Sequence, residues 1–150
     1  MTFFRKPEDP IFCPPERPQG AAPPADLYQA MGSENIHKLL KDFYLELGAS
    51  QIQGMFPKDL EGAAEKSALF FIGLLGGPPL YHQKYGHPRL RQRHLPFRID
   101  SNAREVWLEC FDKVLLNADQ KYNLPTKDLK AFKEFLKRFS AWMVNTESDQ

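Results

Sequence analysis

GGPPLYHQKYGHPRLRQRHLPF, residues 76–97, is the stretch that decides the fold. Its paired glycines and prolines end any helix that precedes it. Basic residues crowd into it, and no acid occurs between Gly76 and Ile99. Three of the chain's four histidines also lie here: His82, His87 and His94. Because amphipathic segments lie on both sides, we expect this stretch to carry the chemistry and the helices to supply the walls.

Four segments outside this stretch carry apolar residues three and four positions apart, the spacing of an amphipathic helix. They cover residues 33–48, 60–75, 101–115 and 126–143. We expect Ser33, Ser101 and Thr126 to cap three of these helices. Shorter helices are expected at 26–32, 80–84 and 89–94. No segment alternates apolar and polar residues over any length, so the predicted fold class is all-α.

The two ends of the chain differ in composition from its middle. Residues 1–25 hold seven of the thirteen prolines and are predicted to form an extended N-terminal extension. Residues 26–146 form the predicted domain, and residues 147–150 a C-terminal tail. A length of 150 residues suits one domain of this kind.

Charge and cysteine content exclude several classes of protein. The net charge of +1 gives the whole chain no strong attraction to nucleic acid or to a membrane surface. Cys13 and Cys110 are far apart and form no CxxC pair, which favours a reducing compartment. No apolar run is long enough to span a bilayer, and residues 1–10 lack a signal-peptide core. A cytoplasmic location is therefore expected.

Most catalytic motifs are missing from the sequence. It has no G-x-S-x-G elbow, no phosphate loop, no dinucleotide fingerprint and no H-E-x-x-H zinc motif. The basic stretch with Tyr81, Tyr85 and Phe97 has the residue types of a single-stranded nucleic-acid surface, but it is short. His87 and His94 would lie about two helical turns apart, too far to share one bare metal ion.

A haem pocket would account for the histidine, the aromatic side chains and the cations of this sequence together. Haem needs an axial ligand such as a neutral histidine, flat apolar walls, and cations near its two propionates. His94 fits the ligand, and its second ring nitrogen would donate to a carbonyl one turn back. A purely structural role for His94 stays open from spacing alone. The other candidates are Arg91, Arg93 and Lys66 for the propionates and Phe56, Phe70, Phe71 and Phe97 for the walls.

Two polar residues lie on apolar helix faces and have two interpretations each. Tyr44 points inward with the core set of its helix, so its hydroxyl either bonds a backbone carbonyl or faces a pocket. Ser67 lies in a run of small residues and either bonds back to its own helix or faces a ligand.

These pieces together resemble the group II truncated haemoglobins. The double glycine and proline, Tyr81, the Gly-His-Pro at 86–88 and the Arg-His at 93–94 occur in the order typical of that family. DFYLEL around Tyr44, MFP around Phe56 and VWLEC around Trp107 support the resemblance, which covers residues 26–145. The proline-rich extension lies outside it.

The resemblance implies a two-over-two helical sandwich around haem b. It implies that His94 is the iron ligand and that Tyr44 and Trp107 are hydrogen-bond donors on the opposite, distal side. Ala63 falls where many globins carry a distal histidine, and Ser67 where the family more often has a larger residue. The predicted haem contacts are His94, Phe56, Lys66, Phe70, Phe71, Tyr81, Leu90, Arg91, Arg93, Phe97, Ile99, Trp107 and Met143.

The function implied is reversible binding of O2, with NO, CO or peroxide as other ligands. Two distal donors would slow O2 release, which favours O2, NO or peroxide chemistry over bulk transport. NO dioxygenase or peroxidase-like turnover would need a reductase. We expect a monomer or weak homodimer that binds neither nucleic acid nor membrane. The alternatives are a haem-free helical interaction domain and a haem-based sensor or carrier.

Overall fold

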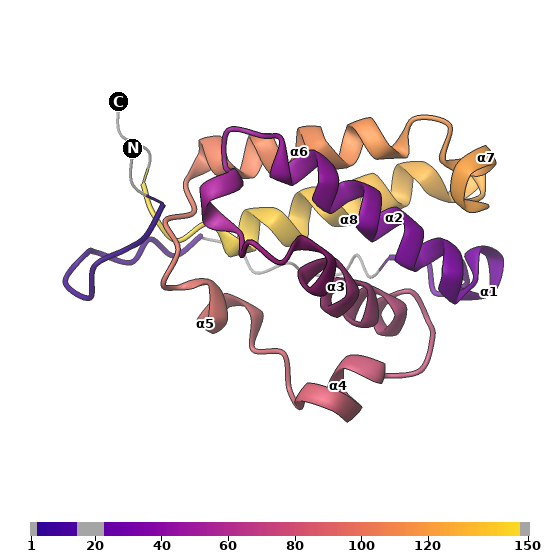
Figure 1. The fold of residues 1–150 in the computed structure, drawn as a ribbon, viewed down its shortest axis with the longest axis horizontal. Coiled ribbons are helices and arrows are strands. Elements are labelled where there is room, and N and C mark those ends of the chain that lie inside the picture. The colour runs from indigo at the N-terminus through magenta and orange to yellow at the C-terminus, as the bar shows by residue number, and fades with distance from the viewer. Residues whose placement is uncertain (1–2, 15–22, 148–150) are drawn as a thin grey trace.

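The computed structural model describes residues 3–14 and 23–147, and the helices in this part of the chain make one sandwich (Figure 1). No β-strand occurs among these residues, which hold one isolated antiparallel bridge between Phe4 and Phe97. The predicted all-α fold is confirmed. The elements are α1 (Leu27–Met31), α2 (Ser33–Gly48), the 3-10 helix η1 (Gln53–Met55), α3 (Leu60–Leu74), α4 (Leu80–Tyr85), α5 (Leu90–His94), α6 (Ser101–Leu115), α7 (Ala118–Tyr122) and α8 (Thr126–Met143).

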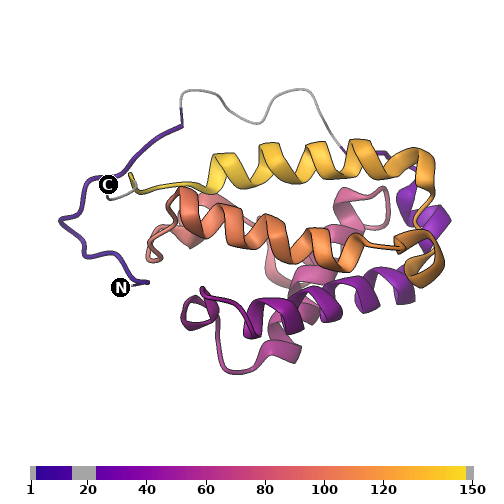
Figure 2. The same ribbon diagram turned by 90° about the horizontal axis from the view of Figure 1, so that it is seen from above.

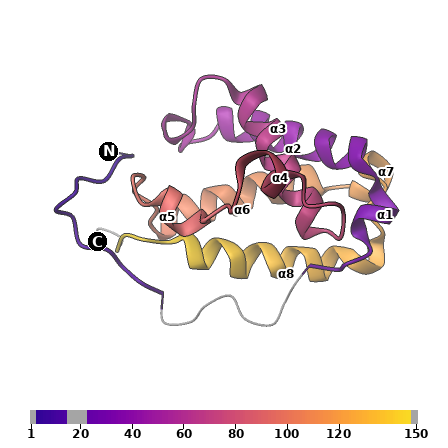
Figure 3. The ribbon, with the colours of Figure 1, turned by 90° about the horizontal axis from the view of Figure 1, so that it is seen from below.

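Four long helices form two packed pairs. Helix α2 packs on α3, α6 packs on α8, and α2 joins the pairs by packing on α6. Seen from above, α2, α6 and α8 run lengthwise beside one another (Figure 2). On the face seen from below, the short helices α4 and α5 lie against α3 and α8 respectively (Figure 3). The predicted site stretch therefore lies across the open side of a rigid four-helix frame.

Three of the helix starts differ from prediction. Asp100, not Ser101, caps α6, because its carboxylate accepts the backbone N–H of Ala103 at 2.9 Å. Gly32 and Pro125 take the cap positions of α2 and α8 without a side-chain bond, so the Ser33 and Thr126 caps were also wrong. The sequence analysis assigned the cap to the first residue of each of these helices, whereas the N-cap position is the residue before it.

Gly76 and Gly77 follow α3 where neighbouring residues pack too closely for a side chain, and Gly76 also has a positive φ. Gly76 has φ 98°, and a Cβ there would lie 1.9 Å from the carbonyl oxygen of Ala25. A Cβ on Gly77 would meet the ring of Tyr28. Only glycine lets the start of α1 approach the end of α3 so closely. The predicted helix stop is confirmed, with α3 ending at Leu74.

Helix α7 is an element that the sequence did not indicate. It spans five residues between two asparagines in the left-handed conformation, Asn117 and Asn123. Five residues are too few to display helical periodicity. Its last residue, Tyr122, is 1% exposed and donates its hydroxyl to Asp42 at 2.6 Å, which ties α7 to α2.

Residues 3–12, which we call the strap, lie against the end of the sandwich formed by α5 and the end of α8 (Figure 3). The strap belongs to the predicted N-terminal extension. Phe3 and Phe12 pack against the core, whereas Ile11 is 52% exposed. Residues 1–2, 15–22 and 148–150 of the predicted terminal segments lie outside the described residues. None of the described helices is long and apolar enough to cross a membrane.

Candidate functional site

Two adjoining cavities lie between the helix pairs and the stretch that carries α4 and α5. Their volumes are about 240 and 290 Å3. Together they reach the size of ordinary small-molecule sites, roughly 300–1000 Å3. Their common lining comes from α2, α5, α6, α8 and the turn after α5: Tyr44, His94, Trp107, Phe139 and Phe97. These shared residues make the two cavities one site.

His94 ends α5 with its imidazole at both cavities. Its Nδ1 lies 2.5 Å from the carbonyl oxygen of Leu90, one turn back, as predicted. A carbonyl only accepts, so Nδ1 carries the proton and Nε2 keeps its lone pair. Burial lowers the pKa of His94 below its usual value, and the bond to Leu90 partly opposes that shift. The ring is therefore neutral at pH 7, and Nε2 is available as a metal ligand.

Tyr44 on α2 and Ser67 on α3 meet at the wall of the larger cavity, which both residues line. Their side chains interact there, and the interaction acts on the pKa of Tyr44. Burial raises the pKa of the Tyr44 phenol, and the interaction with Ser67 lowers it by a smaller amount. Tyr44 is thus a neutral phenol that can donate a proton in a largely dry pocket. Both residues line the larger cavity, which favours the pocket interpretation of each hydroxyl over a bond to backbone.

Trp107 on α6 is held by an aromatic cluster. Its indole packs edge-on against Phe43 and Phe111, with ring centroids 5.5 and 4.8 Å away, and these two phenylalanines stack at 3.7 Å. Phe139 on α8 lies 6.3 Å away on another side. Indole Nε1–H is a donor with no acceptor function. The cluster holds the Trp107 side chain in place where the residue lines both cavities.

One edge of the larger cavity is cationic. Arg93 donates to the Tyr81 hydroxyl at 2.9 Å, and the ammonium of Lys66 lies 6.0 Å from the centre of the Tyr81 ring. Lys66 also lies 4.7 Å from the ring of Tyr85. Two cations at the rim of an apolar slot suit a ligand whose acidic groups point outward.

The structure brings together nearly all of the predicted site residues. Those lining one or both cavities are Tyr44, Phe56, Ala63, Lys66, Ser67, Phe70, Phe71, Tyr81, Leu90, Arg93, His94, Phe97, Ile99, Trp107 and Met143. Arg91 is the exception. Its guanidinium donates to the carbonyl oxygens of Trp142, Val144 and Phe12, at 2.6, 2.8 and 2.5 Å. Carbonyls at the end of α8 attract the cation, and Arg91 lines neither cavity.

Sequence reasoning missed two polar residues at the smaller cavity. Arg104 on α6 donates to the Ser140 hydroxyl on α8 at 3.1 Å and to the Lys137 carbonyl at 2.8 Å. Arg104 lies three residues before Trp107 and thus on the same helix face, which was the available signal. The apolar lining that was also missed is Phe43, Ile52, Met55, Pro57, Ala103 and Phe139.

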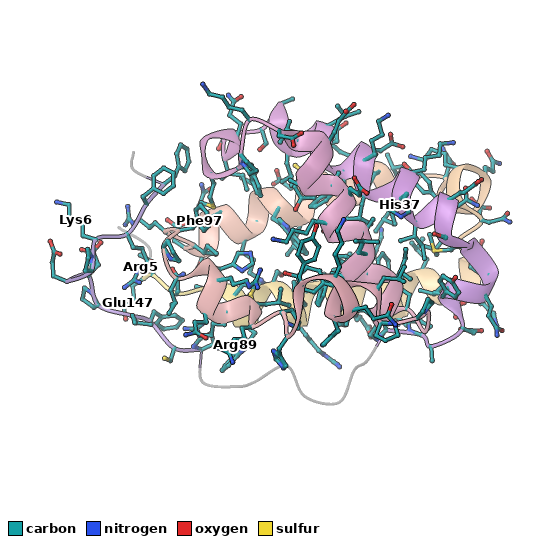
Figure 4. All side chains as sticks on the ribbon, turned by 60° about the horizontal axis from the view of Figure 1, so that its bottom comes forward. Arg5, Lys6, His37, Arg89, Phe97 and Glu147 are labelled. Carbon is teal, nitrogen blue, oxygen red and sulfur yellow. The ribbon has the colours of Figure 1, made fainter. Side chains whose placement is uncertain are left out.

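The other histidines do not line either cavity. His37 lies on α2, far along the molecule from Phe97 (Figure 4). His82 and His87 face each other with ring centroids 5.8 Å apart. Among the described residues, no group of three or more His, Cys, Asp or Glu side chains could hold a bare metal ion.

The residues present fit a haem. A neutral imidazole offers Nε2 as a ligand, aromatic side chains line the cavities, and Arg93 and Lys66 are cations that could pair with the propionates.

Comparison with known proteins agrees with this geometry. The bacterial-like globin family model matches residues 26–145. Group 2 truncated hemoglobin YjbI of Bacillus subtilis is 42% identical over 84 residues, covering 55% of this chain and 64% of that protein. The chain thus matches just under two thirds of that relative's length. Phosphate-bound Hell's gate globin IV superposes with a TM-score of 0.80 at 32% identity, over 92% of this chain and 84% of that one.

The group II truncated hemoglobin from Bacillus anthracis superposes with a TM-score of 0.73 at 31% identity, over 91% of this chain and 96% of that one. The two-over-two helical sandwich is therefore confirmed. The chain belongs to the bacterial-like globin family as a group II truncated haemoglobin, and membership of that family implies a haem cofactor.

Proposed function

We propose that this chain holds haem b through His94 Nε2 and binds O2 reversibly on the opposite side, between Tyr44 and Trp107. The observation that carries the proposal is the bond from His94 Nδ1 to Leu90, which fixes the ring as a neutral ligand aimed at the cavities. Haem iron supplies reversible binding of diatomic ligands and one-electron chemistry when bound.

The protein's own side chains would set how long a ligand stays. Partial negative charge on a bound diatomic molecule favours hydrogen-bond donors in a dry pocket. Tyr44 O–H and Trp107 N–H are two such donors, on α2 and α6. Each hydrogen bond to a charged group contributes on the order of 1.5–3 kcal/mol. Two of them would slow release by roughly two to four orders of magnitude.

Slow release favours turnover over transport. A ligand held for a long time is poorly suited to delivery but well placed to react with NO, peroxide or an electron donor. We therefore propose O2, NO or peroxide chemistry, as an NO dioxygenase or a peroxidase-like protein in the cytoplasm. Either would draw electrons from a reductase, with the protein acting as a monomer or weak homodimer.

Absorption spectra of the purified protein test the haem assignment. The wild type, expressed with added haem precursor, is expected to show a Soret band that His94→Ala loses. His82→Ala and His87→Ala are matched controls and should keep the band, because neither ring lines the cavities. A wild-type protein that shows no Soret band would instead support the alternative of a haem-free interaction domain. Rapid passage of haem to an apo-acceptor would indicate a carrier.

A further inference from the structure

The strap makes contact with the turn after α5 and with α5 itself, at two places that we call the first and second clasps. In the first clasp, the Arg5 N–H donates to Pro96 O and the Arg98 N–H donates to Phe3 O, both at 2.8 Å. The Phe4 ring lies 5.7 Å from the Phe97 ring, and Phe97 lines both cavities. The first clasp therefore holds the turn that directly follows His94.

The second clasp joins the far end of the strap to α5 and to the residues after α8. Phe12 donates its N–H to Asn145 O at 2.8 Å and accepts from Arg91 Nη2 at 2.5 Å. Asn145 is fully buried. Its amide donates to His94 O at 3.1 Å and to Phe97 O at 3.0 Å, and accepts from the Ile99 N–H at 3.1 Å. Asn145 thus connects the strap to the backbone of the predicted iron ligand.

Arg5 joins the two clasps. Its guanidinium donates to Leu95 O at 3.1 Å, beside His94, and to Asp9 O and Pro10 O at 2.7 and 3.1 Å, within the strap. Lys6, the next residue, is exposed and points away from the helices (Figure 4). The two neighbouring cations therefore differ in function: Arg5 fixes the strap to the turn after α5, and Lys6 faces solvent.

The strap also reaches the opposite rim of the smaller cavity. The Phe3 ring packs on Gly54, where a Cβ would lie 2.7 Å from the ring. The residues after Gly54, Met55 and Phe56, line that cavity. One segment outside the globin domain therefore spans from the 3-10 helix on one side to the His94 turn on the other.

We infer that Arg5 and Asn145 are positioning residues for His94, and that the strap is part of the haem site. The inference rests on the proposed role of His94. Helix α5 has only five residues and is preceded by Arg89 in the left-handed conformation, so its own hydrogen bonds fix its orientation poorly. The carbonyl contacts from Arg5 and Asn145 add to those of Arg91 and constrain the residues at and after His94.

The test uses the full chain with haem bound, in the wild type, Arg5→Ala, Asn145→Asp and Lys6→Ala. Asn145→Asp keeps an acceptor for the Ile99 N–H but loses both donors to His94 and Phe97. The iron–histidine stretching band of the ferrous protein, read by resonance Raman, reports on the position of His94. The rate of haem transfer to an apo-acceptor gives a second readout.

We expect Arg5→Ala and Asn145→Asp to broaden and move the band and to speed haem loss about five- to tenfold, as the loss of one or two net hydrogen bonds predicts. Lys6→Ala should match the wild type in both. An unchanged band in both variants would overturn the inference, even with faster haem loss, because that result indicates only looser packing. If Asn145→Asp fails to fold, Arg5→Ala decides. A wild type that binds no haem would instead reject the proposed function.

Discussion

The side chains of Tyr44 and Ser67, from two different helices, interact at the wall of the larger cavity, which both residues line. The interaction with Ser67 lowers the pKa of Tyr44 against the larger, opposite effect of burial. A phenol that is more acidic is also a stronger hydrogen-bond donor. The small residue at position 67 therefore adds to the donor strength of Tyr44 as well as leaving space.

Replacing Ser67 by alanine should raise the pKa of Tyr44 further and weaken its bond to a ligand. We expect O2 dissociation to become roughly two- to tenfold faster, the effect of one net hydrogen bond. Stopped-flow displacement of O2 measures this rate, and Ser67→Thr, which keeps the hydroxyl, is the control. Slower release in Ser67→Ala would mean that Ser67 competes with the ligand for the Tyr44 proton.

Trp107→Phe removes the indole N–H while keeping an aromatic ring against Phe43 and Phe111. Since one bond to a charged acceptor contributes about 1.5–3 kcal/mol, O2 release should quicken by roughly one to two orders of magnitude. The same displacement experiment checks it, with CO release as the comparison because CO carries less negative charge. Equal O2 dissociation rates in the variant and the wild type would show that Trp107 does not stabilise the bound ligand.

Stability at alkaline pH should depend on Tyr122. Burial and the hydrogen bond to Asp42 raise its pKa above the usual value of about 10. The folded protein then keeps the phenol proton when the unfolded chain loses it, so this stabilisation is complete below about pH 10 and declines as pH rises further. Tyr122→Phe should lower the free energy of unfolding by about 1 kcal/mol at pH 7 and flatten the alkaline decline.

Urea unfolding at several pH values from neutral to alkaline measures both effects. The ammonium groups of Lys38 and Lys121 lie 5.9 and 5.2 Å from the Tyr122 ring and remain in the variant. Any decline that persists in Tyr122→Phe belongs to groups other than Tyr122. An equally steep decline in the variant and the wild type would show that Tyr122 contributes nothing.

Two glycines near the end of α3 should respond to alanine in opposite directions. Gly73 lies within the helix with its nearest neighbour 3.8 Å from an added Cβ, so Gly73→Ala should stabilise by about 0.5–1 kcal/mol. Gly76→Ala should destabilise by about 2–4 kcal/mol, because of its positive φ and the Ala25 carbonyl. Thermal unfolding of the two variants measures both effects. Similar melting temperatures would contradict the close approach of Gly76 to the Ala25 carbonyl.

The sequence predicts those parts of this molecule that depend on local pattern. Helices α2, α3, α6 and α8 follow from apolar spacing, and the stop after Leu74 follows from the glycine pair. Arg91 could not be placed in this way, because its partners are carbonyls more than fifty positions away. Asn145 likewise has no sequence signal, since its role comes from backbone groups brought to it by folding.

The most direct measurement is the ferrous absorption spectrum of His94→Gly with and without added imidazole. If His94 Nε2 is the ligand, the variant should lose the wild-type spectrum, and imidazole diffusing into the space left by the side chain should restore it. A His94→Gly protein that keeps the wild-type ferrous spectrum without imidazole would contradict the account.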